Sequence, residues 1–423
     1  MLDQIAKTSN TLSFLLLLLF VAWGPIAQGS VFAGGQAIIT ILGALVFLFC
    51  ILGVALSKRP RFYNLPWITS IVLMIIWIVL SILHAQYSFA AFQQGGLLVS
   101  MFLAALSAQY LLRTVSRRNI FGLWLLLVGT TMSAYGIIQK MGYGKTLTVD
   151  PALITSFYYN PSHFAGYIIL ALPISLWALL FHKSILTKVL GLATSVALFY
   201  CLLHTSSSSF PAAVLASSIV FTLWIWRLFR PLGFIFATSI VLLVGGSVWL
   251  ISDQQKWPLI DQALKFSQKT SMSGFVLPRK RILEQDLKAT QHTPLYGVGP
   301  GNFVYFMPKF RPDKADKGND PSFKLVNYAH NDYFQVAIEL GKTGLAIYLI
   351  IITLTLLSGR RQDMLGASLL SGLTGLWISG LYDAHSTVIA GTMAWAWVST
   401  GAIAGFSIPS QDHAAITAPV ESK

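Results

Sequence analysis

Residues 327–333 contain the side chains best suited to chemistry, reading Asn-Tyr-Ala-His-Asn-Asp-Tyr directly before a long apolar segment. Polar groups at such a boundary are costly unless they face a cavity or take part in a reaction. His330 is a candidate general base, because a neutral imidazole can accept a proton. A helix that begins here would also attract a phosphate group. The same residues fit an interfacial helix cap anchored by tyrosines.

Basic residues upstream could bind an anion. The triplet Arg279-Lys280-Arg281 is followed by the turn-rich segment Pro294–Phe303. Arginine binds phosphate through a planar and often bidentate fork. Contact with lipid headgroups alone would account for the triplet equally well. The glycines of 294–303 are not a nucleotide-binding loop, because no strand precedes them.

Two polar segments border other apolar runs. They read Asn-Pro-Ser-His-Phe-Ala-Gly at 160–166 and His-Thr-Ser-Ser-Ser-Ser-Phe at 204–210. Interfacial placement is the simpler interpretation of His163 and His204 taken by themselves. No Asp-x-Asp pair, His-Glu-x-x-His motif or cysteine cluster occurs, so the sequence indicates no metal ion and no other cofactor.

The composition places these residues in a membrane protein. The chain has 423 residues, of which 55% are hydrophobic and 10% charged, and its mean hydropathy is +0.67. An ordinary soluble domain carries about 25% charged residues. A soluble enzyme, a disordered protein and a nucleic-acid-binding module are therefore excluded. The net charge of +14 is explained instead by the lysines and arginines that orient membrane helices.

Twelve apolar segments each approach the roughly 20 residues that a membrane helix needs. The sequence therefore predicts an all-α integral membrane protein. A cleaved signal peptide is a poor alternative for the first segment, because Trp23-Gly24-Pro25 is an unfavourable cleavage context. The predicted spans are 11–28, 36–56, 66–84, 96–112, 120–140, 163–182, 186–204, 211–228, 231–251, 333–357, 363–381 and 386–407.

Lysine and arginine alternate between the loops. They follow the second, fourth, sixth, eighth and tenth spans, whereas loops 29–35, 85–95 and 205–210 have none. By the positive-inside rule, both termini are cytoplasmic and one long loop, 252–332, is periplasmic. The expected division is residues 1–251 with nine spans, the 252–332 subdomain, residues 333–407 with three spans, and a cytoplasmic tail at 408–423.

The long loop is the place for a small subdomain outside the membrane. Residues 258–270 and 279–291 within it have helical character. Its basic surface fits an anionic partner such as lipid phosphate. Asp383 and His385, between the last two spans, are expected on the same side. The polar candidates therefore gather at one face, which suits an enzyme at the membrane interface.

Three segments resemble a known family. His330-Asn331, nine further residues and Gly341-x-x-Gly344 resemble the signature of bacterial O-antigen ligases. Pro294–Phe303 resembles the Pro-Leu-x-Gly-x-Gly-x-Gly-x-Phe segment of the wider O-antigen ligase and polymerase superfamily. Asn160–Gly166 resembles its Asn-x-x-His-Phe-Ala-Gly segment. Twelve spans with a large periplasmic loop before the tenth are also the layout of this family.

The resemblance implies a glycan transferase of the bacterial inner membrane that works without a metal ion or cofactor. Such enzymes move a glycan from an undecaprenyl diphosphate carrier to a hydroxyl acceptor on the periplasmic side, with inversion at the anomeric carbon. His330 would be the base that activates the acceptor. Arg279, with Arg281 a close second, would hold the diphosphate. The other residues implied in substrate binding are Asn331, Asn160 and His163.

One segment departs from the family pattern. Many members carry a Ser-Arg pair near the outer end of the seventh or eighth span, where this chain reads Ser206-Ser207-Ser208-Ser209 without an arginine. Either a loop cation such as Lys145 substitutes for it, or the donor is held differently.

Ligation to the lipid A-core is the first expectation, ahead of glycan polymerisation and transfer to a protein hydroxyl. The expected partners are the carrier-linked donor, the acceptor and membrane lipids, with no nucleic acid. A transporter of lipid-linked glycans is the alternative from another class, and it should show paired halves or charges at mid-membrane. The two halves share no similarity and the spans contain few charges. A structural scaffold would leave His330 replaceable.

Overall fold

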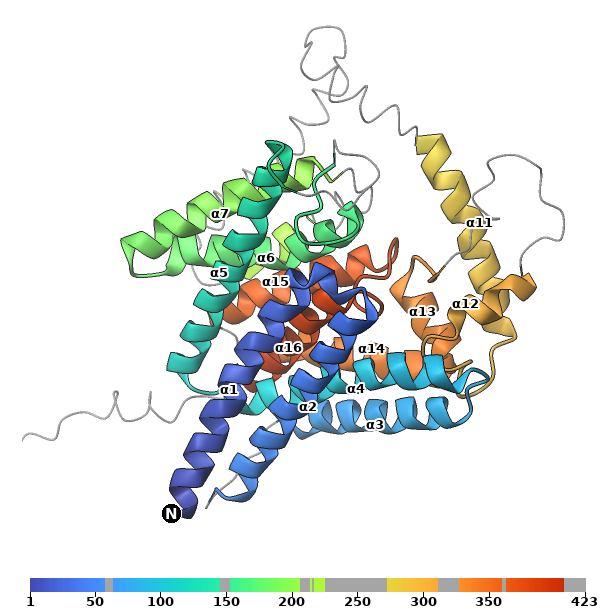
Figure 1. Ribbon diagram of the computed structural model, residues 1–423, viewed down its shortest axis with the longest axis horizontal. Coiled ribbons are helices and arrows are strands. Elements are labelled where there is room, and N and C mark those ends of the chain that lie inside the picture. The colour runs from blue at the N-terminus through green and yellow to red at the C-terminus, as the bar shows by residue number, and fades with distance from the viewer. Residues whose placement is uncertain are drawn as a thin grey trace, which may run out of the picture.

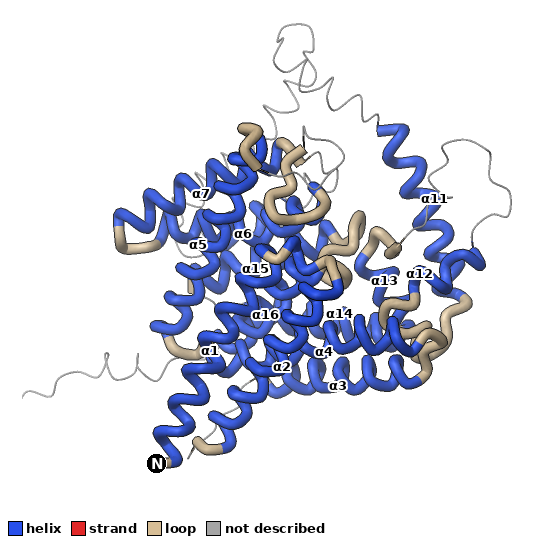
Figure 2. Tube along the Cα trace, viewed as in Figure 1, coloured by secondary structure: helices blue, strands red, loops and turns tan. Residues whose placement is uncertain are grey.

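The computed structural model describes residues 1–57, 64–144, 153–205, 214, 217–224, 272–310, 327–359 and 363–406, with the side chains of the 272–310 segment from Ile282 onward. These residues form helices and turns and include no strand (Figure 2). The all-α prediction is therefore confirmed for the described part of the chain. Eight helices there are long and apolar enough to cross a membrane, so the chain is a multi-pass membrane protein.

These eight helices agree with eight of the predicted spans, and each boundary lies within a few residues except at α1, α4 and α14, where the difference is larger. They are α1 (Leu2–Ile26), α2 (Ala33–Ala55), α3 (Leu65–Leu83), α4 (Ser88–Leu111), α5 (Val115–Lys140), α6 (Pro161–Phe181), α7 (Ile185–Leu203) and α14 (Gly341–Ser358).

The other predicted spans are met in part. The last two correspond to α15 (Met364–Ser379) and α16 (Ala390–Phe406), which are shorter, at 16 and 17 residues. The predicted span 231–251 lies outside the described residues, and 211–228 is described only at 214 and 217–224. The count of twelve therefore stays a prediction.

The helix α16 lies at the centre of the bundle (Figure 1). All of its residues are buried, and it packs against α1, α4, α6, α14 and α15. Small residues allow its close approach to α4, because a Cβ added at Gly401 or Gly405 would collide with the carbonyl oxygen of Ala105 or Gln109. This helix therefore fixes the positions of the helices around it.

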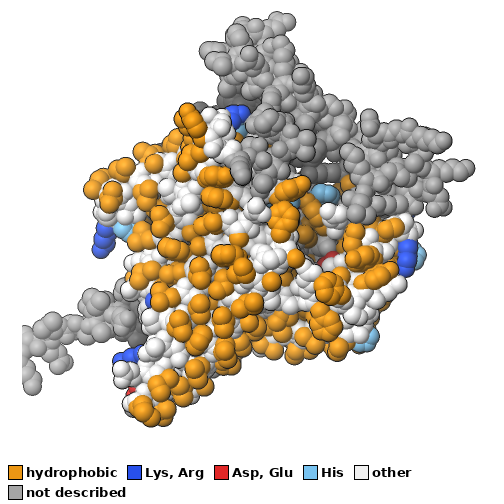
Figure 3. Space-filling model, viewed as in Figure 1, with side chains coloured by type: hydrophobic (Ala, Val, Ile, Leu, Met, Phe, Trp, Pro, Cys, Tyr) orange, Lys and Arg blue, Asp and Glu red, His pale blue; other side chains and the backbone are white. Residues whose placement is uncertain are grey.

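The visible face of the molecule is mostly apolar (Figure 3). Large apolar side chains of the spanning helices are exposed, among them Ile41 on α2, Leu73 on α3 and Val196 on α7. Soluble proteins rarely expose so extensive an apolar surface. Lipid chains can cover it, since the backbone polar groups of helices are already paired within each helix.

The described part of the predicted long loop contains one helix of 20 residues and one short helix. The helix α11 (Met272–Gln291) includes the predicted 279–291 segment, and α12 (Phe303–Phe306) continues into a 3-10 turn at Met307–Phe310. Residues 258–270 and the tail 408–423 lie outside the described residues. The helix α11 packs against the short helix α13 (Asp332–Glu339), which directly precedes α14.

The prediction of one continuous span at 333–357 is wrong. The chain forms two helices here, α13 and α14, with a break at Leu340 and Gly341. Gly341 has a left-handed φ of 73°, which glycine adopts without steric penalty. Two carbonyl oxygens at the break accept hydrogen bonds from α3: that of Leu340 from Trp77 Nε1 at 2.7 Å, and that of Glu339 from the Ser81 hydroxyl at 3.1 Å. The membrane-spanning helix therefore begins only after the break.

The turn-rich segment 294–303 packs at this break. The backbone N–H groups of Val298 and Gly299 donate to the carbonyl oxygens of Ile338 and Glu339, each over 3.0 Å. The last carbonyl groups of a helix have no partner within it. The two bonds satisfy such groups at the end of α13 and fix the segment against it.

Two glycines make this approach possible. A Cβ added at Gly297 would collide with the carbonyl oxygen of Glu339, and a Cβ added at Gly341 would collide with that of Leu295. Both glycines have positive φ angles, 78° and 73°, which disfavour other residues. Two motifs that are far apart in the sequence therefore form one backbone-to-backbone contact.

Gly341→Ala and Gly297→Ala should each destabilise the protein by about 2 kcal/mol or more. A left-handed φ costs a non-glycine residue about 1–2 kcal/mol, and the collision adds to that cost. The measurement is the unfolding temperature of the detergent-solubilised protein. Gly34→Ala and Gly96→Ala are the controls, since a Cβ at either position meets no atom within 4 Å. Equal unfolding temperatures for all four variants would contradict the contact.

Candidate active site

Three segments converge around His330, which lies in the turn before α13. They are this turn, the segment 380–389 between α15 and α16, and the first turn of α6. Nδ1 of His330 lies 3.2 Å from Oδ1 of Asp383. The His330 side chain is 32% exposed, whereas that of Asp383 is 3% exposed. The pair therefore joins an accessible imidazole to a buried carboxylate.

The backbone around His330 explains how its side chain reaches Asp383. His330 has a left-handed φ of 48°, a conformation in which histidine is enriched among non-glycine residues. Asn331 then caps α13, because its Oδ1 accepts from the N–H groups of Tyr333 and Phe334 at 2.9 Å each. A helix cap, which is the alternative interpretation of 327–333, is therefore present at Asn331.

Both the oxygen and the nitrogen of the Asn331 side-chain amide form hydrogen bonds within the protein. Besides the two bonds to its oxygen, its Nδ2 donates to the carbonyl oxygen of Leu381 at 2.9 Å. The side chain thus connects the start of α13 to the segment after α15. A direct contact between Asn331 and substrate stays a prediction.

Asp383 is an ionised carboxylate enclosed by histidines. Its Oδ1 accepts from the Ala384 N–H at 2.9 Å, and its Oδ2 lies 3.8 Å from His385 Nε2. Burial acts to raise the pKa of Asp383, but His385, His330 and His163 outweigh it and hold that pKa well below its usual range. In the neutral tautomer of His330 whose Nδ1–H donates to Asp383, Nε2 is the ring nitrogen that can accept a proton.

The 160–166 segment supplies the third side of the site. His163 Nε2 lies 3.3 Å from the Tyr328 hydroxyl, and the ring centre of His163 is 6.3 Å from that of His385. Asn160 caps α6, since its Oδ1 accepts from the Ser162 N–H at 2.8 Å. The structure thus brings His163 into the cluster and gives Asn160 a helix-capping contact.

Close packing against His385 explains why residue 166 of the same segment is a glycine. A Cβ added there would stand 2.8 Å from the His385 ring, so the glycine lets this ring pack against α6. His204, by contrast, contacts its own helix, with Nδ1 2.9 Å from the Tyr200 carbonyl oxygen. No described contact joins His204 to the His330 cluster.

A small pocket opens beside His330. It is lined by Ile282, Leu283, Ala329, His330, Leu381 and Tyr382. Ile282 and Leu283 belong to α11 and follow Arg279 by three and four residues. Arg279 therefore occupies the same face of α11, one turn earlier. Arg281 lies on a different face, and the side chains of both arginines are outside the described part of the structure.

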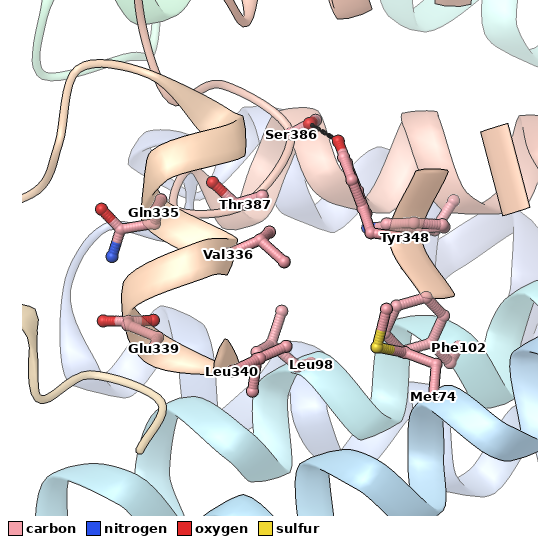
Figure 4. A pocket seen from close by; sticks show the side chains of 11 residues that line it. Met74, Leu98, Phe102, Gln335, Val336, Glu339, Leu340, Tyr348, Ser386 and Thr387 are labelled. Atoms are coloured by element: carbon pink, nitrogen blue, oxygen red, sulfur yellow. Dashed lines mark hydrogen bonds between the residues drawn. The ribbon is translucent and has the colours of Figure 1, made fainter. Parts of the chain in front are cut away.

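A second buried carboxylate, Glu339, lies at the end of α13. Its Oε1 accepts from the Phe303 N–H at 3.4 Å, which ties α13 to the 294–303 segment. Burial raises the pKa of Glu339 to about 7, although hydrogen bonds from Gly301, Gln335 and Phe303 act to lower it. Glu339 and Gln335 line one side of a cavity whose other walls are largely apolar (Figure 4).

The arrangement suits the removal of a proton from a hydroxyl group. An accessible imidazole oriented by a buried carboxylate is a recurrent design for general-base catalysis. Among the residues that the structure describes, no group of three or more His, Cys, Asp or Glu side chains is placed to hold a metal ion.

A family model described as O-antigen ligase matches residues 192–349. This segment belongs to the O-antigen ligase family. The O-antigen ligase segment contains Arg279, the 294–303 turns, His330 and both glycines of the Gly-x-x-Gly motif. The family supports a membrane glycan ligase or polymerase type of activity. A search of curated proteins finds no match to the chain.

The rest of the site comes from outside the O-antigen ligase segment. His163 on α6 precedes it, and Asp383 and His385 follow it. The loop pattern of the sequence predicts the last two on the same side as His330, but no motif pairs them with it. A usable signal was present, since Asp-Ala-His-Ser-Thr at 383–387 is polar and interrupts two apolar helices.

Glu339→Gln should flatten the pH dependence of stability. A carboxyl with a pKa of about 7 when folded, against 4.5 when unfolded, stabilises the fold at low pH. That contribution is complete below the unfolded pKa and is lost as the pH rises through the folded one. The unfolding temperature of the wild type should therefore fall more steeply between about pH 5 and about pH 8 than that of the variant.

Glu284→Gln, at an exposed position of α11, is the control for the loss of a charge. Parallel curves for the wild type and Glu339→Gln would show that Glu339 does not titrate in this range.

Proposed function

We propose that this protein transfers a glycan from undecaprenyl diphosphate to a hydroxyl acceptor on the periplasmic side, and that the acceptor is the lipid A-core. The observation that carries the proposal is the His330–Asp383 pair, which lies at a pocket and joins the O-antigen ligase segment to the α15–α16 loop. A structural scaffold would have no need for an accessible imidazole backed by a buried carboxylate.

The reaction follows from the geometry of this pair. His330 Nε2 accepts the proton of the acceptor hydroxyl, and the hydroxyl oxygen forms a bond to the anomeric carbon. The bond from that carbon to the diphosphate breaks, and its electron pair leaves with undecaprenyl diphosphate. Attack opposite to the leaving group inverts the anomeric carbon. Asp383 stabilises the imidazolium that forms, and a positioned base of this kind contributes typically about 10²–10⁴-fold.

Arg279 is the proposed contact for the diphosphate. Negative charge builds on this group as the glycosidic bond breaks, and a preorganised arginine stabilises it most in a site of lowered dielectric. The helix position of Arg279 on the face of α11 that reaches the His330 pocket supports it over Arg281. His163, Asn160 and Asn331 are proposed to shape the substrate site from α6 and α13.

The cations at the other end of the bundle support a periplasmic site. Arg118 Nη1 lies 3.2 Å from Asp363 Oδ2, at the start of α15, whereas Asp383 follows the end of α15. Arg113 and Arg117 lie near the same turn between α4 and α5. Because cationic loops remain in the cytoplasm, the proposed orientation places both termini there and His330 outside, in the inner membrane.

His330→Ala should lower glycan transfer by roughly 100-fold or more, and Asp383→Asn should do nearly the same, because the base or its orientation is lost. The measurement uses the purified protein in liposomes with undecaprenyl-diphosphate glycan and lipid A-core, and follows the gel shift of the lipid A-core. His204→Ala is the matched control, since this histidine lies outside the cluster.

Other products would redirect the proposal. Longer carrier-linked glycans without a shifted lipid A-core band would indicate a polymerase, and labelled protein would indicate a protein glycosyltransferase. Passage of the donor across the bilayer without any transfer would support a transporter. Normal transfer by His330→Ala would remove this residue from the mechanism.

Arg279→Ala should lower kcat/KM for the donor by roughly 10–100-fold, because a hydrogen bond to a charged group is worth about 1.5–3 kcal/mol. Arg279→Lys should be affected less, since it keeps the charge and loses the fork. Initial rates at varied donor concentration measure the effect, with Arg281→Ala as the matched comparison. Equal rates for the wild type and both Arg279 variants would argue against a diphosphate contact.

A further inference from the structure

Asp332, the first residue of α13, places a buried carboxylate against the loop that carries Asp383. Asp332 is 1% exposed. Its Oδ1 accepts from the Thr387 hydroxyl at 2.6 Å, and its Oδ2 accepts from the Ser386 hydroxyl at 2.7 Å. The Ser386 N–H lies 3.2 Å from both oxygens. Two adjacent residues of the loop are therefore bound to one carboxylate.

The backbone of Asp332 holds the same loop at a second point. Its N–H donates to the carbonyl oxygen of Gly380 at 2.8 Å. The fit is close, because a Cβ added at Gly380 would stand 2.6 Å from Asp332 Oδ2. The two anchor points lie on either side of Asp383 in the sequence. The loop 380–387 is thus fixed at both flanks of the residue that contacts His330.

The network extends into the neighbouring helix. The Tyr348 hydroxyl of α14 lies 2.8 Å from the Ser386 hydroxyl (Figure 4). A buried carboxylate is stable only when its oxygens are well supplied with donors, and the donors in turn need an acceptor. Removing the Asp332 carboxylate would deprive the Ser386 and Thr387 hydroxyls of their acceptor and would loosen the loop.

We propose that Asp332 is a positioning residue for the His330–Asp383 pair. By holding both flanks of the 380–387 loop, it sets the separation of the Asp383 carboxylate and the His330 imidazole. The role of Asp332 in catalysis rests on the proposed function, whereas its effect on the chemical reactivity of the His330 side chain does not. Asp332 itself touches neither His330 nor the pocket beside it in the described contacts.

A double-mutant cycle tests the route of this effect. Asp332→Asn should lower kcat by roughly 10–100-fold without a change in KM for the donor, because small misplacements near a reacting group have effects of this size. If Asp332 acts only through Asp383, Asp332→Asn should cause no further loss in an Asp383→Asn background. Thr387→Val removes one hydrogen bond from the other side and should show the same pattern more weakly.

Glu339→Gln is the matched control. Glu339 is a buried carboxylate at the other end of α13, and its hydrogen-bond donors Gly301, Phe303 and Gln335 lie outside the 380–387 loop. Any loss of activity in Glu339→Gln should add to that of Asp383→Asn. Full additivity of Asp332→Asn with Asp383→Asn would mean a general structural role and would overturn the proposal.

A second measurement does not depend on glycan transfer. The rate at which diethyl pyrocarbonate modifies His330, followed by mass spectrometry, should change by the same factor in Asp332→Asn and in Asp383→Asn. Glu339→Gln should react as the wild type does. An unchanged rate in either of the first two variants would overturn the proposal. A wild-type protein without any transfer activity would contradict the proposed function instead, and this comparison would still decide the part of Asp332.

Discussion

A helix that ends inside an apolar bundle leaves carbonyl groups that need donors, and the site depends on how the chain meets this constraint at the end of α13. The carbonyls of Ile338, Glu339 and Leu340 accept hydrogen bonds from the 294–303 turns and from α3. Because α13 ends at Glu339, it is a helix distinct from α14, and it packs between the predicted long loop and the spanning helices. Tertiary contacts therefore place the residues at the start of α13, which include His330 and the capping residue Asn331.

The carboxylate beside His330 comes from the loop between α15 and α16, which lies against the start of α13. Asp383 is enclosed with His385 and His163, and a carboxylate in such surroundings stays ionised in spite of its burial. It lies outside the segment that matches the O-antigen ligase family, as does His163. The matched segment thus carries His330, while the chain outside it supplies the carboxylate that contacts the His330 imidazole.

The sequence predicted the helical class and most spans because a long apolar segment is a strong and local signal. It also made His330 a candidate site residue, since polar side chains at the edge of an apolar segment are costly unless they face a cavity or take part in a reaction. The partner Asp383 could not be paired with it, because that contact joins residues 53 apart and depends on packing. The break at Gly341 was missed since apolar residues continue on both sides and glycine is common in membrane helices.

Because of the reciprocal contact of Gly297 and Gly341, the 294–303 turns and the α13–α14 junction must remain complementary in any related sequence. Each glycine leaves room for the backbone beside the other, so neither segment can change its shape alone. Chimeras that exchange the α13–α14 region with a relative should therefore carry the 294–303 turns from the same parent. A crossover point between residues 303 and 332 would combine turns from one parent with an α13–α14 junction from another, and the two backbones would no longer fit each other.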